Sequence, residues 1–261
     1  MQNLIQEIIV YGPVYLVMTL ITFLNVIVPV SGSSTQTPLI AAITGDAHYA
    51  VTISSWLLMI SCGMLAFVFR KDINKDYFWK LLPMSVIGAI IGASLVIQLP
   101  NWLVSLILVV SAIRFLYKKT KHFLSKNKQK NEEKKNAHHI VVNAVGLFSS
   151  FLQGMGLSGG WLRSSFLYSE NLKLEQVRGT AERLNFIIFA IAGLVRFNEN
   201  QLSLFDMFKW TIIFSPLLFI SIYLGRKSLL KLSDKVKDGI IILIMLYATV
   251  RLTVKIMETF F

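Results

Sequence analysis

Apolar segments long enough to cross a bilayer recur along the whole length of this chain. An α-helix needs about 20 residues to cross roughly 30 Å of hydrocarbon. Segments that approach or exceed this length are residues 8–30, 47–69, 78–99, 101–117, 140–157, 177–195, 206–224 and 236–254. The composition agrees, since 54% of the residues are apolar, 15% are charged and the mean hydropathy is +0.61. The chain is therefore predicted to be an all-α polytopic membrane protein.

One polar stretch, residues 118–139, separates two apolar halves. It carries eight lysines and two glutamates, and so accounts for half of the net charge of +12. Such a run is typical of a cytoplasmic loop that contacts anionic lipid headgroups. We expect a first transmembrane repeat in residues 1–117, a lysine-rich cytoplasmic loop in 118–139 and a second transmembrane repeat in 140–261. No aromatic-interleaved basic face accompanies the lysines, which argues against nucleic acid as a partner.

The two halves resemble each other in the order of their small and helix-breaking residues. Offsets of 127 and 133 positions align such residues at matching places. The aligned pairs are Ser31 with Ser158, Gly32 with Gly159, Pro83 with Pro216, and Gly92 with Gly225. Two offsets that differ by only six residues indicate a duplicated membrane unit, which is a common build of transporters.

Two short stretches decide how often each half crosses the membrane. Residues 32–47 and 159–174 are too short to cross comfortably as full helices. They are either re-entrant hairpins, with four spans per half, or short crossing elements, with five. Five elements place the basic cluster of residues 226–237 on the cytoplasmic side and leave only scattered charges such as Arg196 outside.

An odd number of elements per half has a consequence for symmetry. Each repeat would have four long transmembrane helices plus one short or broken helix, and the second repeat would enter the membrane in the opposite sense to the first. We therefore expect inverted repeats. The alternative is two parallel four-span repeats with hairpins that dip in from outside.

Small and polar residues mark the start of both short stretches. Gly32, Ser33 and Ser34 open the first, and Gly159 and Gly160 open the second. Irregular backbone at this depth must face protein or a cavity, because lipid cannot satisfy its amide groups. Where a short helix begins after such a glycine, its first N–H groups favour an anion. The alternative is that these residues only allow close helix packing, but two equivalent turns favour an anion site.

Arg163 sharpens this prediction. A charged side chain at the centre of a membrane helix costs about 2.5–3.5 kcal/mol, and is therefore seldom kept without a partner. Arg163 has no carboxylate nearby in the sequence, and its counterpart at an offset of 127 is Gln36, another planar hydrogen-bond donor. Arg183 is a second candidate for contact with substrate, with snorkelling to the interface as the alternative.

In these features the chain resembles the TauE/SafE family of sulfite and organosulfonate exporters, also called the toluene sulfonate uptake permease family. The family has a twice-repeated unit with a glycine-rich turn, a small-residue segment and a helix with spaced glycines. The first unit shows Ser31 to Pro38, Ala50 to Ser54, and Gly88 with Gly92; the second shows Gly156 to Gly160, Gly179 with Thr180, and Pro216 with Gly225. The resemblance implies a permease for small anions such as sulfite, thiosulfate or sulfonates, although Arg163 replaces a usually apolar position.

We therefore expect a plasma-membrane permease that exports a small sulfur-containing or carboxylate anion by alternating access around a midplane site. One alternative is uptake coupled to a proton through His48, Asp46 or Glu182. Another is a non-transporting membrane assembly protein. The sequence indicates no enzyme, because no nucleophile or acid/base pair can be named, and it indicates no cofactor. It indicates no metal site, because no His/Cys ligand spacing accompanies the single cysteine, Cys62. It leaves the oligomeric state open, with a homodimer as one option.

Overall fold

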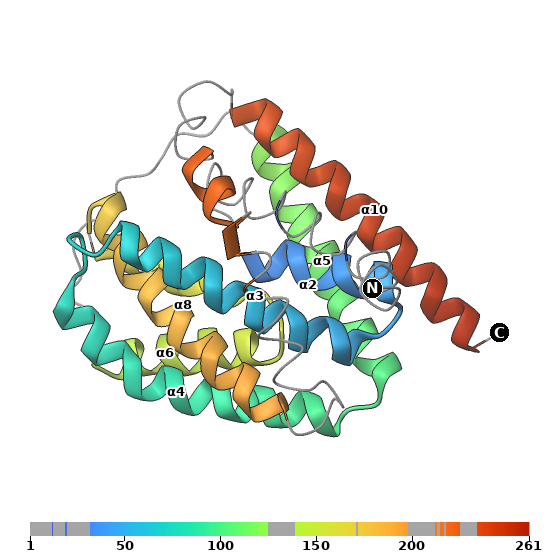
Figure 1. Ribbon diagram of the computed structural model, residues 1–261, viewed down its shortest axis with the longest axis horizontal. Helices are drawn as coiled ribbons and strands as arrows, with labels where there is room; N and C mark the ends of the chain where they lie inside the picture. Colours follow the sequence, from blue (N-terminus) through green and yellow to red (C-terminus); the bar gives the residue numbers. More distant parts are fainter. Residues whose placement is uncertain are drawn as a thin grey trace.

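The computed structural model of the protein is helical throughout the part of the chain that it describes (Figure 1). The described residues are 12, 19, 32–124, 139–170, 172–197, 212, 215–216, 218–224 and 234–260. They form α2 (Gly32–Thr44), α3 (Ala47–Val68), α4 (Lys75–Gln98), α5 (Asn101–Leu124), α6 (His139–Gly154), α7 (Gly160–Ser169), α8 (Leu174–Phe197) and α10 (Asp234–Phe260). No strand occurs within these ranges, so the predicted all-α class is confirmed for them.

Polar caps set the starts of the two most apolar helices. The Asp46 carboxylate accepts a hydrogen bond from the Tyr49 amide at 3.1 Å and so caps α3, and Asn74 does the same for α4 through the Tyr77 amide at 3.1 Å. Gly45, at a φ of 78°, allows the tight turn between α2 and α3. These local signals separate consecutive apolar segments into distinct helices.

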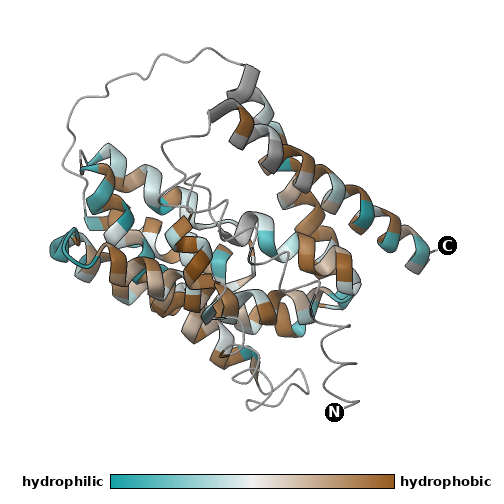
Figure 2. Ribbon diagram, turned by 45° about the horizontal axis from the view of Figure 1, so that its top comes forward, coloured by the Kyte–Doolittle hydropathy of each residue, from teal (hydrophilic) through white to brown (hydrophobic). Residues whose placement is uncertain are grey.

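Helices α3 and α4 are each long and apolar enough to cross a membrane, with 22 and 24 residues. Hydrophobic residues predominate along most of the helices (Figure 2). Large apolar side chains of α4 and α10 are exposed. Examples are Ile87, Ile91, Leu243, Leu246 and Val250. A helix that is apolar both inside and outside the bundle is suited to lipid rather than to water.

The backbones of α4 and α6 approach each other through glycines. A Cβ atom at Gly88 would overlap the Leu147 carbonyl, and one at Gly92 would overlap the Phe151 carbonyl. From the first contact to the second, the residue number rises by four on both helices, so α4 and α6 run parallel. The Gly-x-x-x-Gly spacing of α4 therefore serves close helix packing, as small residues commonly do in membranes.

Helices α3 and α8 lie side by side and run antiparallel. The contacting pairs are Val51 with Arg196, Trp56 with Gly193, Gly63 with Phe186, and Phe69 with Gly179. Residue numbers rise along α3 as they fall along α8, which fixes the direction. At the far end of this contact, the Asn74 amide donates to the Thr180 hydroxyl at 3.0 Å.

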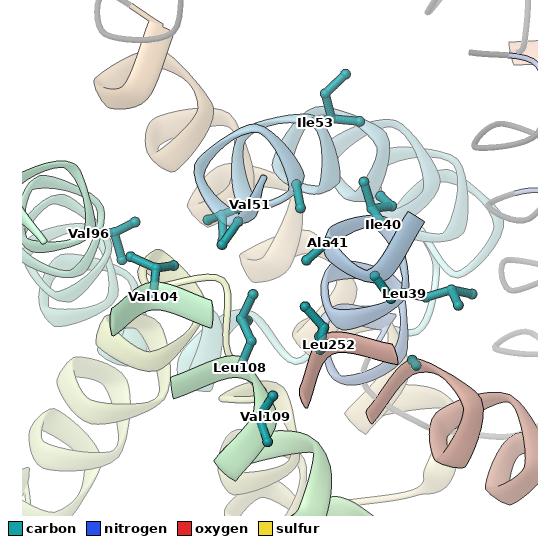
Figure 3. Packing of buried hydrophobic residues seen from close by; sticks show 14 of the residues in the cluster. Leu39, Ile40, Ala41, Val51, Ile53, Val96, Val104, Leu108, Val109 and Leu252 are labelled. Carbon is teal, nitrogen blue, oxygen red and sulfur yellow. The ribbon is translucent and has the colours of Figure 1, made fainter. Parts of the chain in front are cut away.

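An apolar cluster packs α2, α5 and α10 against α3. Leu39 and Ile40 of α2 pack with Leu108 of α5 and Leu252 of α10, and Val51 of α3 completes the group (Figure 3). In Figure 1 these three helices lie to one side of the group formed by α3, α4, α6 and α8. The short helix α2 is thereby enclosed on several sides, and its residues from Thr35 to Ala42 are buried.

The predicted segments overlap helices wherever the structure describes them, and one helix extends past the boundary predicted for it. Helix α5 continues to Leu124, seven residues into the stretch that was expected to be loop from residue 118. Lysine is a good helix former, so a helix that leaves the apolar layer can continue through a basic sequence. The predicted spans 8–30 and 206–224 lie largely outside the described residues.

Candidate functional site

A helical hairpin formed by α6 and α7 creates the setting of the candidate site. Gly156, at a φ of 79°, reverses the chain after α6, and α7 begins at Gly160 as a helix of 10 residues. A Cβ atom at Gly159 would overlap the Ser149 carbonyl, so only glycine allows α7 to lie this close to α6. The prediction of a short helix after this turn is confirmed, and the glycines have a packing role in it.

Arg163 points from α7 into the interior of the bundle and is completely buried, with 0% of its surface exposed. Its Nη2 donates to the hydroxyls of Ser149 and Ser150 at 3.1 and 2.9 Å and to Gln153 Oε1 at 2.9 Å. Its Nη1 donates to Asn185 Oδ1 at 2.7 Å. The guanidinium therefore joins three helices, since the first three partners belong to α6 and the last to α8.

Asn185 links this cluster to a carboxylate. Its Oδ1 accepts from both Arg163 and Gln153, and its Nδ2 donates to Glu182 Oε2 at 3.4 Å. Arg163 itself has only neutral oxygen partners, and no carboxylate within the described ranges lies at salt-bridge distance from it. We call Ser149, Ser150, Gln153, Arg163 and Asn185 the Arg163 cluster.

The charge of the Arg163 cluster is therefore balanced only indirectly. Glu182 lies one side chain away, beyond Asn185, and also beside the buried thiol of Cys62. Arg163 Nε has no hydrogen-bond partner within the described part of the chain. A buried guanidinium with neutral partners and an unused N–H retains the capacity to bind an anion.

The other residues singled out in the sequence lie outside this cluster. Gln36 is buried in α2 with 1% of its surface exposed, and none of the hydrogen bonds of Arg163 reaches it. Gly32, Ser33 and Ser34 form the first turn of α2, which begins where it was predicted, but the serine side chains lie outside what the structure describes. Arg183 is exposed on α8 and is not a neighbour of Arg163 in the hydrogen-bond network.

Two of the residues proposed for proton coupling have structural contacts. Asp46 caps α3, and His48 Nε2 forms a hydrogen bond with the Leu99 carbonyl at 2.9 Å. Cys62 is buried beside Leu58 and Phe189, in agreement with the packing role expected for it. Within the described ranges, no group of three or more His, Cys, Asp or Glu residues is placed to bind a metal ion.

Arg196 is a buried arginine that the sequence did not single out. It was expected only as one of several scattered charges on the outer side of the membrane, but only 1% of its surface is exposed and its Nη1 donates to Ser55 on α3. A signal for this was available in the pattern of α8. Arg196 continues the buried stripe of Leu184, Ile188 and Ala192 at helical spacing, whereas Arg183 falls off that stripe.

A helical bundle with exposed apolar faces, two membrane-length helices and two buried arginines has the features of an integral membrane protein. Residues 14–252 of the 261-residue chain match the family described as Sulfite exporter TauE/SafE. The chain belongs to this family, and the resemblance stated from the sequence is confirmed. The family is one of membrane transporters for anions of the sulfite type. No curated protein and no solved structure gives a significant match to the chain.

Proposed function

We propose that this protein exports a small oxoanion across the plasma membrane and binds it beside Arg163. The substrate class is sulfite, thiosulfate, an organosulfonate or a similar small carboxylate. The observation that carries the proposal is the completely buried guanidinium of Arg163, whose hydrogen-bond partners are all neutral. Membership of the TauE/SafE family supports the same class of substrate.

The depth of the site fits a transport role. Asn185 is the twelfth of the 24 residues of α8, so its contact with Arg163 falls near the middle of a helix about 36 Å long. An uncompensated charge at that depth costs about 2.5–3.5 kcal/mol. A bound anion would offset this cost, and departure of the anion would restore it. Such a site can bind its substrate without retaining it too tightly for release.

The residues of the site divide their roles by chemistry. Ser149, Ser150 and Gln153 orient the guanidinium through neutral oxygens and leave its positive charge intact. The free Nε of Arg163 and the first amides of α7 supply donors for the oxygens of the anion. Export of an anion needs no coupling ion, because an inside-negative potential favours its exit by about 2.3 kcal/mol per charge per 100 mV.

The packing of equivalent helices supports inverted repeats. An offset of 127 residues aligns the start of α3 at Ala47 with the start of α8 at Leu174, and these two helices pack antiparallel. Two helices related by an axis along the membrane normal would instead run parallel. We therefore propose a multi-pass, inverted arrangement in which one group of helices rocks against the other around the site.

This topology places the central loop and the loop before α10 on the same, cytoplasmic side. Cysteines introduced at Lys231 and Lys128 in a Cys62→Ala background should both be protected from an impermeant thiol reagent in intact cells and both react in inverted vesicles. Labelling of the position of Lys231 from outside, with that of Lys128 protected, would contradict the inverted arrangement.

One observation favours a second candidate, uptake coupled to a proton. Glu182 is partly buried and has no direct hydrogen bond with Arg163, but it accepts one from Asn185, which in turn accepts one from Arg163. Protonation of Glu182 would then alter the charge balance of the Arg163 cluster. In proteoliposomes without a membrane potential, sulfite flux that follows an imposed pH gradient and is lost in Glu182→Gln would favour coupling, whereas flux that is indifferent to the gradient favours a uniporter.

The direct test is sulfite efflux from proteoliposomes. Arg163→Ala should lower efflux by about 100-fold, equivalent to about 2.7 kcal/mol of lost interaction. Arg163→Lys should recover only part of it, because an ammonium group cannot reproduce the planar fork of the guanidinium. Arg251→Ala, at an exposed arginine of α10, is the matched control. Wild-type efflux in folded Arg163→Ala protein would exclude Arg163 from the site.

A further inference from the structure

The last turn of α8 carries a second buried arginine with an incomplete set of partners. Arg196 has 1% of its surface exposed and lies between α8 and α3. Its Nη1 donates to the Val51 carbonyl at 3.2 Å and to the Ser55 hydroxyl at 2.6 Å. Both acceptors are neutral, and both lie on the face of α3 that packs against α8.

The opposite edge of the same guanidinium is unused. Neither Nε nor Nη2 of Arg196 has a hydrogen-bond partner within the described part of the chain, and no carboxylate described there is at salt-bridge distance. The N–H groups of Nε and Nη2 point in the same direction along one edge. This edge is the fork that binds two oxygens of a carboxylate or sulfonate at once.

A purely structural role accounts for only part of this arrangement. The bonds from Nη1 tie α3 to α8, and a cation in the last turn complements the dipole of α8. Neither effect requires the charged group to be fully buried or two of its nitrogens to lack acceptors. Buried polar groups are nearly always satisfied, so an exception of this kind calls for a specific explanation.

We propose that Arg196 binds a second oxoanion through its Nε and Nη2 edge, and so forms an outer binding station between α3 and α8. The proposal rests on the proposed function, since the ligand is the same class of transported anion. Arg196 lies eleven residues beyond Asn185 on α8, or about 16 Å along the helix. An anion released from the Arg163 cluster would meet this second station on its way out.

The surroundings of Arg196 suit a small ligand with oxygen atoms. Gly193 lies one turn earlier on the same face of α8, and the indole of Trp56 covers it, since a Cβ atom at Gly193 would lie 3.2 Å from that ring. The Ser55 hydroxyl fixes the guanidinium from the side of α3. Two weak binding sites in series favour fast transport, because an anion can enter each site but is not bound so tightly that it cannot leave.

The test counts bound anions by isothermal titration calorimetry with sulfite under nitrogen. The wild-type protein should bind two sulfite ions per chain and Arg196→Gln one, while the control Arg251→Gln, at an exposed arginine, should keep two. One site in the wild type that persists unchanged in Arg196→Gln would overturn the outer station and leave the proposed function intact. Absence of any sulfite binding by the folded wild type would overturn both.

A measurement on the unaltered protein covers the case in which Arg196→Gln does not fold. Selenate has the shape of sulfate, and its selenium scatters X-rays anomalously. Crystals soaked in selenate should show an anomalous peak within hydrogen-bond distance of Nε and Nη2 of Arg196, in addition to one beside Arg163. An acidic side chain of the protein on that edge, with no peak, would overturn the proposal.

Discussion

The two buried arginines, Arg163 and Arg196, are matched in burial and differ in how their hydrogen-bonding capacity is used. Arg163 donates to four oxygens from α6 and α8, and Arg196 donates to two from α3. Neither has a described carboxylate as a direct partner. Burial alone therefore does not define the role of a membrane arginine. The number and charge of its partners decide whether it is a cross-link between helices, a site for an anion, or both.

This difference separates stability from binding at the two positions. The partners of Arg163 lie on two helices and would lose their donor if the side chain were removed, so part of its role is to hold α6, α7 and α8 together. The partners of Arg196 are the Ser55 hydroxyl and the Val51 carbonyl, and loss of their donor should change the free energy of unfolding only slightly. Arg196 has two nitrogens without an acceptor, Nε and Nη2, whereas Arg163 has only Nε. We therefore expect the charge of Arg196 to matter more for anion binding than for stability.

The largest expected difference is in stability, between the variants in which each arginine is replaced singly by alanine. Arg163→Ala should destabilise the fold by about 1–3 kcal/mol, because four buried oxygens on α6 and α8 lose their donor while the cost of burying the charge is relieved. Arg196→Ala should change stability by less than about 1 kcal/mol, because the loss of two hydrogen bonds to neutral oxygens is offset by relief from burying a charge. Thermal unfolding in detergent without added anion would measure both. Equal destabilisation by the two variants would remove the distinction drawn between them.

An intermediate effect is expected from placing a carboxylate on each guanidinium. Asn185→Asp keeps the size of the side chain and puts a negative charge 2.7 Å from Arg163 Nη1. The fold should persist while the affinity for sulfite falls about 10-fold or more, equivalent to at least about 1.4 kcal/mol. Ser55→Asp should do the same at Arg196 and leave the Arg163 site occupied. Binding isotherms would measure both, and unchanged sulfite binding by Asn185→Asp would show that the charge of Arg163 is not what attracts the anion.

Much of the fold could be predicted because apolar length and helix-breaking residues are local signals. Helices α2 and α7 begin at Gly32 and Gly160, where the turns were expected. The close approach of α4 and α6 could not be derived, because a pair of glycines specifies a close contact but not the partner. The five-element repeat remains a proposal, supported by the antiparallel contact of α3 with α8.

The candidate site could be predicted where a residue violates a local rule. Arg163 was found because a charge deep in an apolar segment is costly, and its burial agrees with that reasoning. Arg183 gave the same signal but lies on an exposed face, and Arg196 was overlooked because it stands at the end of a span. The packing of α8 against α3 decides which face of α8 is buried. In the sequence, only the periodicity of the apolar residues of α8 indicates this face.

The smallest expected effects come from single hydroxyl groups, and they test the comparison most finely. Arg163 Nη2 has three acceptors for its two N–H groups, so Ser149→Ala still leaves Ser150 and Gln153 as acceptors. This substitution should weaken the free energy of sulfite binding by less than about 0.5 kcal/mol. Arg196 has two acceptors, and Ser55 is the nearer of them at 2.6 Å. Ser55→Ala should therefore weaken sulfite binding at the outer station by about 5-fold, equivalent to about 1 kcal/mol for one hydrogen bond. Calorimetric titration of both alanine variants would measure the difference. A larger loss from Ser149→Ala than from Ser55→Ala would mean that Arg163 is the guanidinium with no acceptor to spare, and that the assignment of cross-link and open fork should be exchanged.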